Sequence, residues 1–548
     1  MDPAGGRWVD ERLQRFAGDT ELELRTGWFP NRDRWCGVYS EWRRIVAYRR
    51  RGANAYRASG DGFRWRRLCS CWHLDRGESL LMSADRSDQP TSSLAAHTTA
   101  VAVLSVAVAV VLGDSGVVTL ALPEILRDFG AQVWGVAWVL IAFNLSLALV
   151  AVPAARVCVR GDPAVATAGG VICFTAATTV CAVAPSLGVL IAARAAQAAG
   201  GALVIVGSLE LLVAASGAER AGVRRWAAAG VAGAALGPVV GGLLTSAFSW
   251  RAIFVVQIPA VLLALPVAIA LRGRVVRRRP TLDTSPDRPH MLANLALALL
   301  SAALTAALFL LVLLLVDGWD RSPAVAAVAV TAVPVAALAA GPAFRGVRAG
   351  TRSEAVAGSV LIAGGLTGLA LLPGAELVWT LAPQALIGLG LGLSVDSLTA
   401  AALRDRIPRA LHGGWTIAAR HAGVVIGLAI LTPIFTADLH HAQTPAEEAI
   451  ASLVLDAPLP ASTKLDLAEQ LGRRLSAERG RVPDLRPAFN TLHLPASQAP
   501  AAAALERGLE DQLTRAATRA FRTAFLVAAG LALLALGPAL ALRDRGRS

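Results

Sequence analysis

From residue 97 onward, long apolar runs alternate with short polar connections along the chain. A run of about 20 apolar residues is long enough to cross the hydrocarbon core of a bilayer as an α-helix. The runs predict twelve membrane-spanning helices, over residues 97–122, 132–153, 163–184, 187–212, 227–247, 251–271, 291–316, 323–341, 354–373, 378–402, 413–435 and 521–542. The fold class expected from this pattern is an all-α membrane protein.

Arginine residues gather in every second connection between these runs. Twenty of them lie in residues 156–160, 220–225, 272–288, 345–352, 404–409 and 543–547, whereas the short connections opposite hold three, Arg127, Arg251 and Arg321. Basic residues in short loops stay in the cytoplasm when a membrane protein inserts. We therefore expect a multi-pass protein of the cell membrane with both termini in the cytoplasm, and the alternation supports the helix count.

A short stretch after the second predicted helix recurs after the eighth. Pro153-Ala-Ala-Arg156-Val-Cys-Val-Arg-Gly161 returns as Pro342-Ala-Phe-Arg345-Gly-Val-Arg-Ala-Gly350, so that Pro153 corresponds to Pro342. Transporters that rock two halves about a midplane site contain such parallel repeats. The repeat divides the chain into two six-helix halves, residues 97–272 and 291–542, joined by a cytoplasmic linker, residues 273–290. A cytoplasmic lead (82–96) precedes the first half, and a cytoplasmic tail (543–548) follows the second.

The longest connection, residues 437–520, is predicted to be an extracytoplasmic loop. The pattern of Leu465, Leu467 and Leu471 and the run Leu505–Leu513 are typical of amphipathic helices. We expect amphipathic helices that form a lid or lie on the membrane surface. The alternative is a partly ordered spacer.

Residues 1–81 differ in composition from the rest of the chain. All three tyrosines and six of the thirteen tryptophans lie among them, interleaved with arginines and without an apolar period or a signal-peptide core. Interleaved Arg and Trp could bind RNA or anionic lipid. We expect instead that translation starts at Met82, which begins a short polar lead into the first helix, and that residues 1–81 come from a misassigned start.

Composition excludes a soluble protein. Hydrophobic residues make up 55% of the 548 residues and charged residues 17%, which is too little charge to cover a water-exposed surface. The formal net charge of +13 would suit a nucleic-acid partner, but the basic residues lie in short clusters between apolar runs, as they do in membrane proteins. We expect no nucleic acid to bind.

Four motifs lie in predicted helices one, four, five and six. They are Asp114-Ser-Gly-Val-Val-Thr-Leu-Ala-Leu-Pro-Glu-Ile125, Arg194-Ala-Ala-Gln197, Gly233-Ala-Ala-Leu-Gly237-Pro238-Val-Val-Gly241-Gly242, and Trp250-Arg-Ala-Ile-Phe254 with Ile258-Pro259. Together they resemble the drug/proton antiporter branch of the major facilitator superfamily, whose members commonly have fourteen helices. The resemblance implies a major facilitator fold of two six-helix halves that move about a shared site.

The chain departs from this family at several positions. Gly116 stands where the family has threonine. In the loop between helices two and three, Cys158 stands at the expected aspartate, and Asp162 and Pro163 replace basic residues. That loop latches the two halves in relatives, so we expect gating to be affected. The two additional central helices of the branch are missing, since only about 20 polar residues separate predicted helices six and seven.

The resemblance makes Asp114 and Arg194 candidates for a proton-coupled site. Burial in a membrane disfavours the charged form of a carboxyl group, so an intramembrane acid can bind and release a proton. Asp114 is expected to bind a proton or a cationic substrate, or else to be a structural partner of Arg194. Arg194, with Gln197, is expected to relay protons or line the cavity, or else to form that structural pair.

Two more carboxylates and another arginine lie in predicted helices. Asp396, about 12 Å deeper than Arg404 along its helix, is a candidate second acid. Glu210 is a further candidate, with a side chain that reaches toward water as the alternative. We expect Arg420 to reach toward the membrane surface in the same way.

The glycines of predicted helix five are a candidate gating motif. Gly233, Gly237, Gly241 and Gly242 allow a neighbouring backbone to approach closely, and Pro238 removes a backbone hydrogen bond and bends the helix. The motif is predicted to seal one side of a cavity while the other side opens. The alternative is tight helix contact alone.

The chain contains no metal-ligand set, nucleophile–base pair or phosphate-binding loop, so neither a cofactor nor an enzymatic activity is expected. The predicted function is proton-coupled efflux of amphiphilic or cationic small molecules by a monomer surrounded by membrane lipid. One alternative is transport of another substrate, such as a lipid, metabolite or nutrient, on the same fold. The other is a transporter-like protein that has lost coupling and acts as a sensor or assembly factor.

Overall fold

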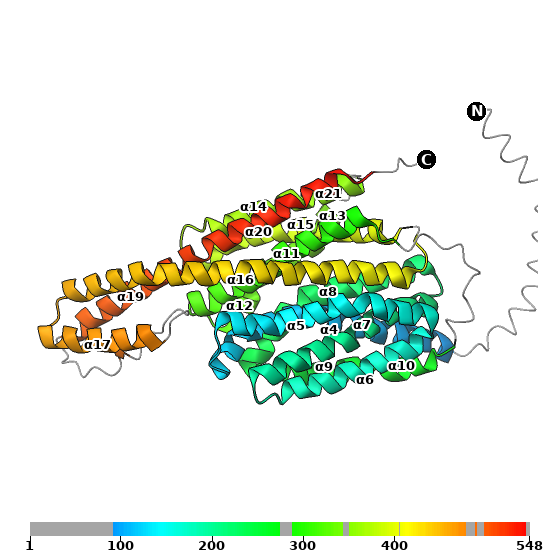
Figure 1. Ribbon diagram of the computed structural model, residues 1–548, viewed down its shortest axis with the longest axis horizontal. Helices are drawn as coiled ribbons and strands as arrows, with labels where there is room; N and C mark the ends of the chain where they lie inside the picture. The colour runs from blue at the N-terminus through cyan, green and yellow to red at the C-terminus, as the bar shows by residue number, and fades with distance from the viewer. Residues whose placement is uncertain are drawn as a thin grey trace, which may run out of the picture. The chain divides into compact units, whose positions relative to one another are not determined.

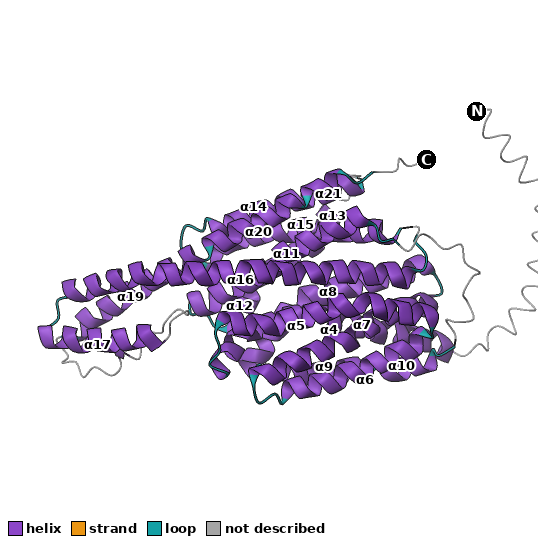
Figure 2. Ribbon diagram, in the orientation of Figure 1, coloured by secondary structure: helices purple, strands orange, loops and turns teal. Residues whose placement is uncertain are grey.

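The computed structural model describes residues 91–273, 288–343, 350–404, 406–477, 488–489 and 498–543. The Arg/Trp-rich region and the expected start at Met82 lie outside the described residues, as do Arg345 and most of the linker 273–290. Figure 2 shows the described part as helices joined by loops.

The helices alternate in direction along the chain, and several spans consist of two consecutive helices. In order they are α4 (Thr91–Asp128), α5 (Val133–Arg160), α6 (Pro163–Ala182), α7 (Leu187–Ser216), α8 (Glu219–Ala247), α9 (Ala252–Leu262), α10 (Ala264–Ala270), α11 (Met291–Leu313), the π-helical turn η3 (Leu314–Gly318), α12 (Pro323–Val330), α13 (Ala332–Ala343), α14 (Thr351–Ala370), α15 (Leu377–Leu403), α16 (Arg409–Asp456), α17 (Ala461–Ala477), α19 (Ala499–Ala520), α20 (Arg522–Leu534) and α21 (Leu536–Leu540).

Twelve stretches of these helices are long and apolar enough to cross a membrane, which confirms the predicted fold class. The first span, His97–Asp128, runs past the predicted end at residue 122. Its last turn carries Arg127 and Asp128, which are too polar for a hydropathy pattern to include. There Arg127 and Asp128 form ion pairs with residues at the ends of other spans.

The start of α11 shows how a polar residue begins a membrane helix. The backbone N–H of Ala293 donates to Nδ1 of His290 at 3.3 Å, so His290 caps the helix. Burial, and after it the charge of Arg406, lowers the pKa of His290. The ring is therefore neutral around physiological pH, which leaves Nδ1 able to accept this hydrogen bond.

The two halves repeat one arrangement of helix contacts. In the first half α4 packs against α8, α6 against α7, α5 against α7, and α6 against α9. The second half repeats these pairs as α11 with α16, α14 with α15, α13 with α15, and α14 with α20. The halves meet where α5 packs against α16 and α8 against α12, and α5 and α16 can be followed side by side in Figure 1. The parallel repeat is thus present in three dimensions.

Glycines make the equivalent contacts in both halves. A Cβ added to Gly233 or Gly237 of α8 would collide with the backbone of α4, at the carbonyls of Ala109 and Gly113. In the second half, Gly423 and Gly427 of α16 occupy the corresponding places and approach the carbonyls of Ala298 and Ala302 on α11 in the same way. Such contacts let two helix backbones touch without side chains between them. The glycine motif of predicted helix five therefore has an unpredicted counterpart in the second half.

Contacts between helix ends agree with the predicted alternation of sides. Glu219 forms an ion pair with Arg409, and both lie in connections assigned to the cytoplasm. Arg127 pairs with Asp317 at 3.0 Å, and both lie in connections assigned to the opposite side. Which of the two sides is cytoplasmic stays a prediction from the arginine count.

Residues 437–520 contain helices with a core of their own. α16 continues to Asp456, beyond its membrane span, and packs against α17 and α19 (Figure 1). The apolar positions spaced along these helices gather in one cluster of buried side chains, among them Ile450, Val454, Leu467, Leu471, Leu505 and Leu509. The described part of this segment is therefore a small helical subdomain.

Enlarging a glycine at a helix contact should destabilise the protein. Gly233→Ala and Gly423→Ala each push a methyl group into backbone atoms of the facing helix, which we expect to cost about 1–3 kcal/mol as overpacking does elsewhere. The measurement is the thermal unfolding midpoint of the purified protein. Gly169→Ala is the matched control, because no atom lies within 4 Å of its added Cβ. Equal midpoints for all three variants would contradict the assigned contacts.

Candidate functional site

Asp114 and Arg194 form a buried ion pair between α4 and α7. Both side chains are 0% exposed, and Oδ2 of Asp114 lies 2.5 Å from Nη2 of Arg194. Opposite charges interact strongly in a low-dielectric interior, and removal of either one leaves the other uncompensated. In the structure Asp114 and Arg194 are thus paired, as the structural alternative in the sequence analysis predicted.

Arg194 is held in place by several other groups. Its Nη1 donates to Oε1 of Gln197 at 2.6 Å, and its Nε donates to the carbonyl of Val139 at 3.4 Å. The guanidinium carbon lies 4.1 Å from the centre of the Phe143 ring, within the range of a cation–π contact. Gln197 belongs to α7, as Arg194 does, and Val139 and Phe143 belong to α5. The guanidinium is therefore held by its own helix and by α5.

Gln197 extends this network into two further helices. Its Nε2 donates to Oγ1 of Thr178 at 2.9 Å and to Oε1 of Gln257 at 3.2 Å. Thr178 belongs to α6 and Gln257 to α9. The helices α4, α5, α6, α7 and α9 of the first half therefore meet at one polar centre. Residues three apart lie on the same face of a helix, so the Arg-x-x-Gln spacing lets Arg194 and Gln197 both face this centre.

A second hydrogen-bonded chain crosses from one half to the other. Ser115, next to Asp114, accepts a hydrogen bond from Nδ2 of Asn144 on α5 at 3.2 Å. Oδ1 of Asn144 lies 2.7 Å from Nδ1 of His421 on α16. Because Nδ2 of Asn144 also donates to the carbonyl of Leu140 at 2.8 Å, Oδ1 is the acceptor that faces the ring, and Nδ1 of His421 carries the proton.

Gly116 of α4 faces the proline of the glycine motif on α8. A Cβ at Gly116 would stand 3.0 Å from Cδ of Pro238, the proline of the glycine motif on α8. The proline ring therefore occupies the space that a side chain at residue 116 would need.

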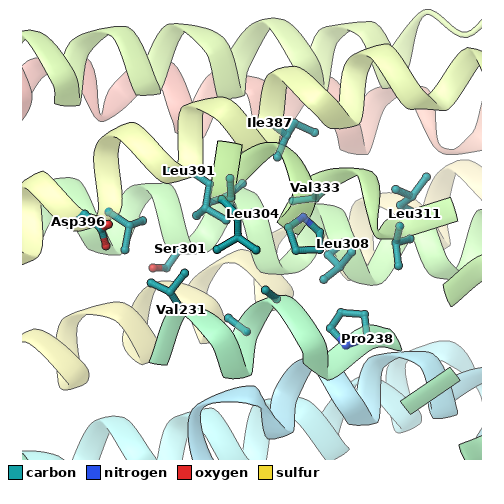
Figure 3. A pocket seen from close by; sticks show the side chains of 18 of the residues that line it. Val231, Pro238, Ser301, Leu304, Leu308, Leu311, Val333, Ile387, Leu391 and Asp396 are labelled. Carbon is teal, nitrogen blue, oxygen red and sulfur yellow. The ribbon is translucent and has the colours of Figure 1, made fainter. Parts of the chain in front are cut away.

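A cavity of about 310 Å³ lies between α8 of the first half and the helices of the second half. Most of its wall is apolar, with Pro238, Leu304, Leu308 and Leu311 among the lining residues. Three polar side chains line it as well: Ser301 from α11, Asp396 from α15 and Arg420 from α16. Figure 3 shows Asp396 and Ser301 toward one end and Leu311 and Pro238 toward the other. The cavity is therefore amphipathic along its length.

Asp396 and Arg420 thus line one cavity, although the sequence analysis predicted a second acid for Asp396 and a side chain at the membrane surface for Arg420. Asp396, the predicted second acid, lines the cavity and is apart from the Asp114–Arg194 pair. Arg420 does not reach toward the membrane surface as we expected but lines the same cavity, so that prediction was wrong. Its helix begins at Arg409, earlier than the predicted residue 413, so Arg420 lies about three turns inside α16.

The remaining predicted residues lie away from both sites. Glu210, half-buried, follows Arg194 on α7 and lies about 24 Å further along the helix axis. Arg156 is exposed near the end of α5, Gly161 follows the last residue of α5, and Gly350 precedes the first residue of α14. The structure therefore does not bring these residues together with the ion pair.

The altered loop between α5 and α6 has a structural explanation. Asp162 accepts hydrogen bonds from the backbone N–H groups of Ala164 and Gly273, both at 2.9 Å, and Pro163 occupies the first position of α6. An acid at the cap followed by proline is a favourable helix start. Cys158 is buried in an apolar cluster that joins α5 to α16, with Val152, Ala155, Ala166, Val206, Ala410 and Leu411. The residue at the family's aspartate position therefore takes part in an apolar contact between α5 and α16, and the expected effect on gating stays a prediction.

The sequence analysis missed Asn144, Gln257 and His421 as site residues. Each is a polar residue inside an apolar span and is buried in the structure. A polar group in a membrane segment is costly and usually has a partner, so each could have been identified by that signal alone. Their partners could not, because Asn144 and His421 lie in different halves of the sequence.

No group of three or more metal-ligating side chains occurs in the part of the chain that the structure describes. The polar groups of the ion pair and the cavity are carboxylate, guanidinium, amide, imidazole and hydroxyl groups. Such groups can bind and transfer protons and can bind charged or polar ligands.

Comparison with known proteins gives a family and relatives. The sequence model of the Major Facilitator Superfamily matches residues 104–431. Multidrug resistance protein Stp of Mycobacterium tuberculosis (strain ATCC 25618 / H37Rv) is 36% identical over 149 residues, which are 27% of this chain and 28% of that protein. The multidrug efflux pump LfrA of Mycolicibacterium smegmatis (strain ATCC 700084 / mc(2)155) is 34% identical over 167 residues, 30% of this chain and 33% of that protein. The chain thus spans a third or less of the length of each relative.

Among the solved structures that share the fold is that of a bacterial transporter. It is a bacterial homolog of the human lysosomal transporter Spinster, in an inward-facing and unoccupied conformation. The two chains superpose with a TM-score of 0.51 over 82% of this chain and 99% of the other, at 14% sequence identity. At that identity the likeness concerns the fold alone, and it agrees with the two-half arrangement described above.

Removal of one partner of the buried ion pair should destabilise the protein more than removal of both. Asp114→Asn leaves the Arg194 guanidinium buried without a counter-charge, which we expect to cost about 3–5 kcal/mol. The double variant Asp114→Asn with Arg194→Gln should regain part of this loss. The measurement is equilibrium unfolding of the purified protein. Glu469→Gln, which breaks an exposed ion pair on α17, is the control and should unfold like the wild type; a double variant less stable than Asp114→Asn would contradict the pairing.

Proposed function

We propose that the chain, which belongs to the Major Facilitator Superfamily, is a secondary transporter of the cell membrane that exports amphiphilic or cationic small molecules in exchange for protons. The names of the two relatives, a multidrug resistance protein and a multidrug efflux pump, support this function. The amphipathic cavity supports a cargo with both a polar and an apolar part.

The observation that carries the proposal is the completely buried ion pair of Asp114 and Arg194. A proton that binds Asp114 removes its negative charge and leaves Arg194 with neutral acceptors, namely Gln197 and the carbonyl of Val139. A buried guanidinium without a counter-charge is unfavourable, so protonation favours a rearrangement that gives it water or another anion. Proton binding would in this way be converted into movement of α4 relative to α7.

The glycine contacts provide a route from this movement to the cavity. Gly233 and Gly237 hold α8 against the backbone of α4, and Pro238 in the same motif forms part of the cavity wall. Because no side chains separate the two helices there, a displacement of α4 should carry α8 with it. The predicted gating motif would then act as a rigid connection between the proton site and the cavity.

The hydrogen-bonded chain between the halves provides a second route. Ser115 adjoins Asp114 in the sequence, and His421 adjoins Arg420 of the cavity. Asn144 joins Ser115 to His421. A change at the proton site would therefore reach the cavity through one amide and one imidazole group, and coupling between two sites requires an element of this kind that both can displace.

Orientation and assembly complete the proposal. The arginine count assigns both termini, and the connections that hold Glu219 and Arg409, to the cytoplasm. The subdomain of α17 and α19 would then lie outside the cell membrane. We propose a monomer surrounded by lipid, with protons and a small-molecule cargo as its partners.

Asp114→Asn should abolish proton-driven efflux, because an amide cannot take up the proton that drives the cycle. The measurement is protonophore-sensitive uptake of a dye into inverted vesicles that contain the full chain, because export from the cell corresponds to uptake in this orientation. Asp466→Asn, the same substitution at an exposed position of α17, is the control and should transport like the wild type. Undiminished proton-driven efflux by Asp114→Asn would exclude the proposed role, and efflux that no protonophore affects in the wild type would favour the sensor or assembly-factor alternative.

The connection through His421 should depend on its hydrogen bond and not on its charge. His421→Asn places an amide nitrogen as many bonds from Cα as Nδ1 and can still donate to Asn144, whereas His421→Leu cannot. We expect His421→Leu to lower proton-driven efflux about tenfold, the equivalent of one lost buried hydrogen bond, and His421→Asn to restore most of it. Equal efflux by both variants, measured at matched expression in the same vesicles, would show that the connection has no part in coupling.

A further inference from the structure

The polar end of the cavity holds two opposite charges that are not paired with each other. Asp396 comes from α15 and Arg420 from α16, and both line the cavity. Neither side chain, however, makes a hydrogen bond or an ion pair with any residue that the structure describes.

Two separated charges are unusual in an apolar wall. In this structure Asp396 is exposed and Arg420 half-buried, so water can reach both. A ligand that fills the cavity displaces this water, and a charge that loses its water without gaining a partner loses several kcal/mol. A direct pair between Asp396 and Arg420 would satisfy both groups, as it does for Asp114 and Arg194. Held apart, they present one position for a cationic group and one for an anionic group within the same cavity.

The sign of a ligand's charge decides how well it fits between these groups. A ligand with one positive charge pairs with Asp396 but brings that charge close to Arg420, and like charges repel. A ligand with one negative charge pairs with Arg420 but brings that charge close to the negative Asp396, which repels it. A ligand that carries both signs pairs with both residues and leaves neither charge uncompensated.

The rest of the wall determines the shape of such a ligand. Leu304 and Leu308 of α11 and Pro238 of α8 line the cavity beyond the charged end, and Figure 3 shows Pro238 and Leu308 away from Asp396. Burial of apolar surface against these side chains favours a hydrocarbon or aromatic body. The hydroxyl of Ser301 adds one further polar contact at the charged end.

We propose that this cavity binds zwitterionic amphiphiles, with the cationic group of the head against Asp396, the anionic group against Arg420, and the apolar body along Leu304, Leu308 and Pro238. This inference rests on the proposed transport function in one respect, since it names the class of cargo that the cavity would carry. It narrows that cargo from amphiphilic or cationic molecules in general to those whose polar head carries both signs of charge.

The test is equilibrium binding of three dyes to the full chain in lipid nanodiscs, followed by fluorescence anisotropy with empty nanodiscs subtracted. Rhodamine B is zwitterionic at neutral pH, rhodamine 6G is its cationic ester relative, and fluorescein is the anionic member of the same ring family. We expect rhodamine B to bind about tenfold more tightly than either of the others, the difference that one additional charged hydrogen bond supplies.

Two variants should change the preference in opposite directions. Asp396→Asn should weaken rhodamine B and rhodamine 6G about tenfold and strengthen fluorescein. Arg420→Gln should weaken rhodamine B and fluorescein and strengthen rhodamine 6G. A variant that merely misfolds would weaken all three dyes, so the opposite changes identify the charges themselves. Glu469→Gln and Arg473→Gln, which remove one charge each from an exposed pair on α17, are the matched controls and should bind all three dyes like the wild type.

Equal affinity for the three dyes, or changes of the same sign for all of them in both variants, would overturn the inference. Because binding is measured without a proton gradient, the outcome is separate from that of the efflux assay. Charge-dependent binding together with no efflux would contradict the transport function but leave the ligand class in place. Proton-driven efflux that does not depend on Asp396 or Arg420 would support the transport function but contradict the proposed ligand class.

Discussion

A buried ion pair constrains more of this structure than any other interaction. Asp114 and Arg194 are both fully buried, and each is stable there only while the other stays charged and in contact. The helices around them therefore have to exclude water and hold their distances closely. Phe143 covers the guanidinium, Gln197 ties it to α6 and α9, and the glycine contacts keep α4 and α8 together without side chains that would need room to move. The compact first half follows from the needs of its polar centre.

The second half keeps the same backbone arrangement but has different chemistry. Gly423 and Gly427 repeat the contacts of Gly233 and Gly237. When α4 is aligned with α11 through Ala109 and Ala298, Asp114 corresponds to Ala303. When α7 is aligned with α15 through their glycine contacts at Gly200 and Gly390, Arg194 corresponds to Gln384. With no charge pair to enclose, this half can surround a cavity instead. Its own charges, Asp396 and Arg420, line that cavity and are not paired with each other. A repeated scaffold thus carries a closed polar centre on one side and an open one on the other.

The sequence was sufficient for the fold and for part of the site. The apolar runs predict twelve spans because length and hydropathy are local properties, and the motifs identify Asp114, Arg194 and the α8 glycines because their spacing lies within one helix. The connection from Ser115 through Asn144 to His421 was not predictable, since it depends on which faces of α5 and α16 meet. Arg420 was misplaced because the start of α16 lies within a polar stretch, where hydropathy does not mark a helix end.

The interface between the halves is held by weaker interactions than the first half itself. Where α5 meets α16, small apolar side chains and Cys158 form the contact, and Glu219 pairs with Arg409 at a position partly exposed to solvent. An exposed ion pair and a contact of small side chains are easily separated, whereas the Asp114–Arg194 pair is not. A force applied to this molecule would therefore open the interface between the halves before it disturbed either half. The halves are then expected to move relative to each other at this interface, and the hydrogen bond between Asn144 and His421 is one of the bonds that such a movement has to break.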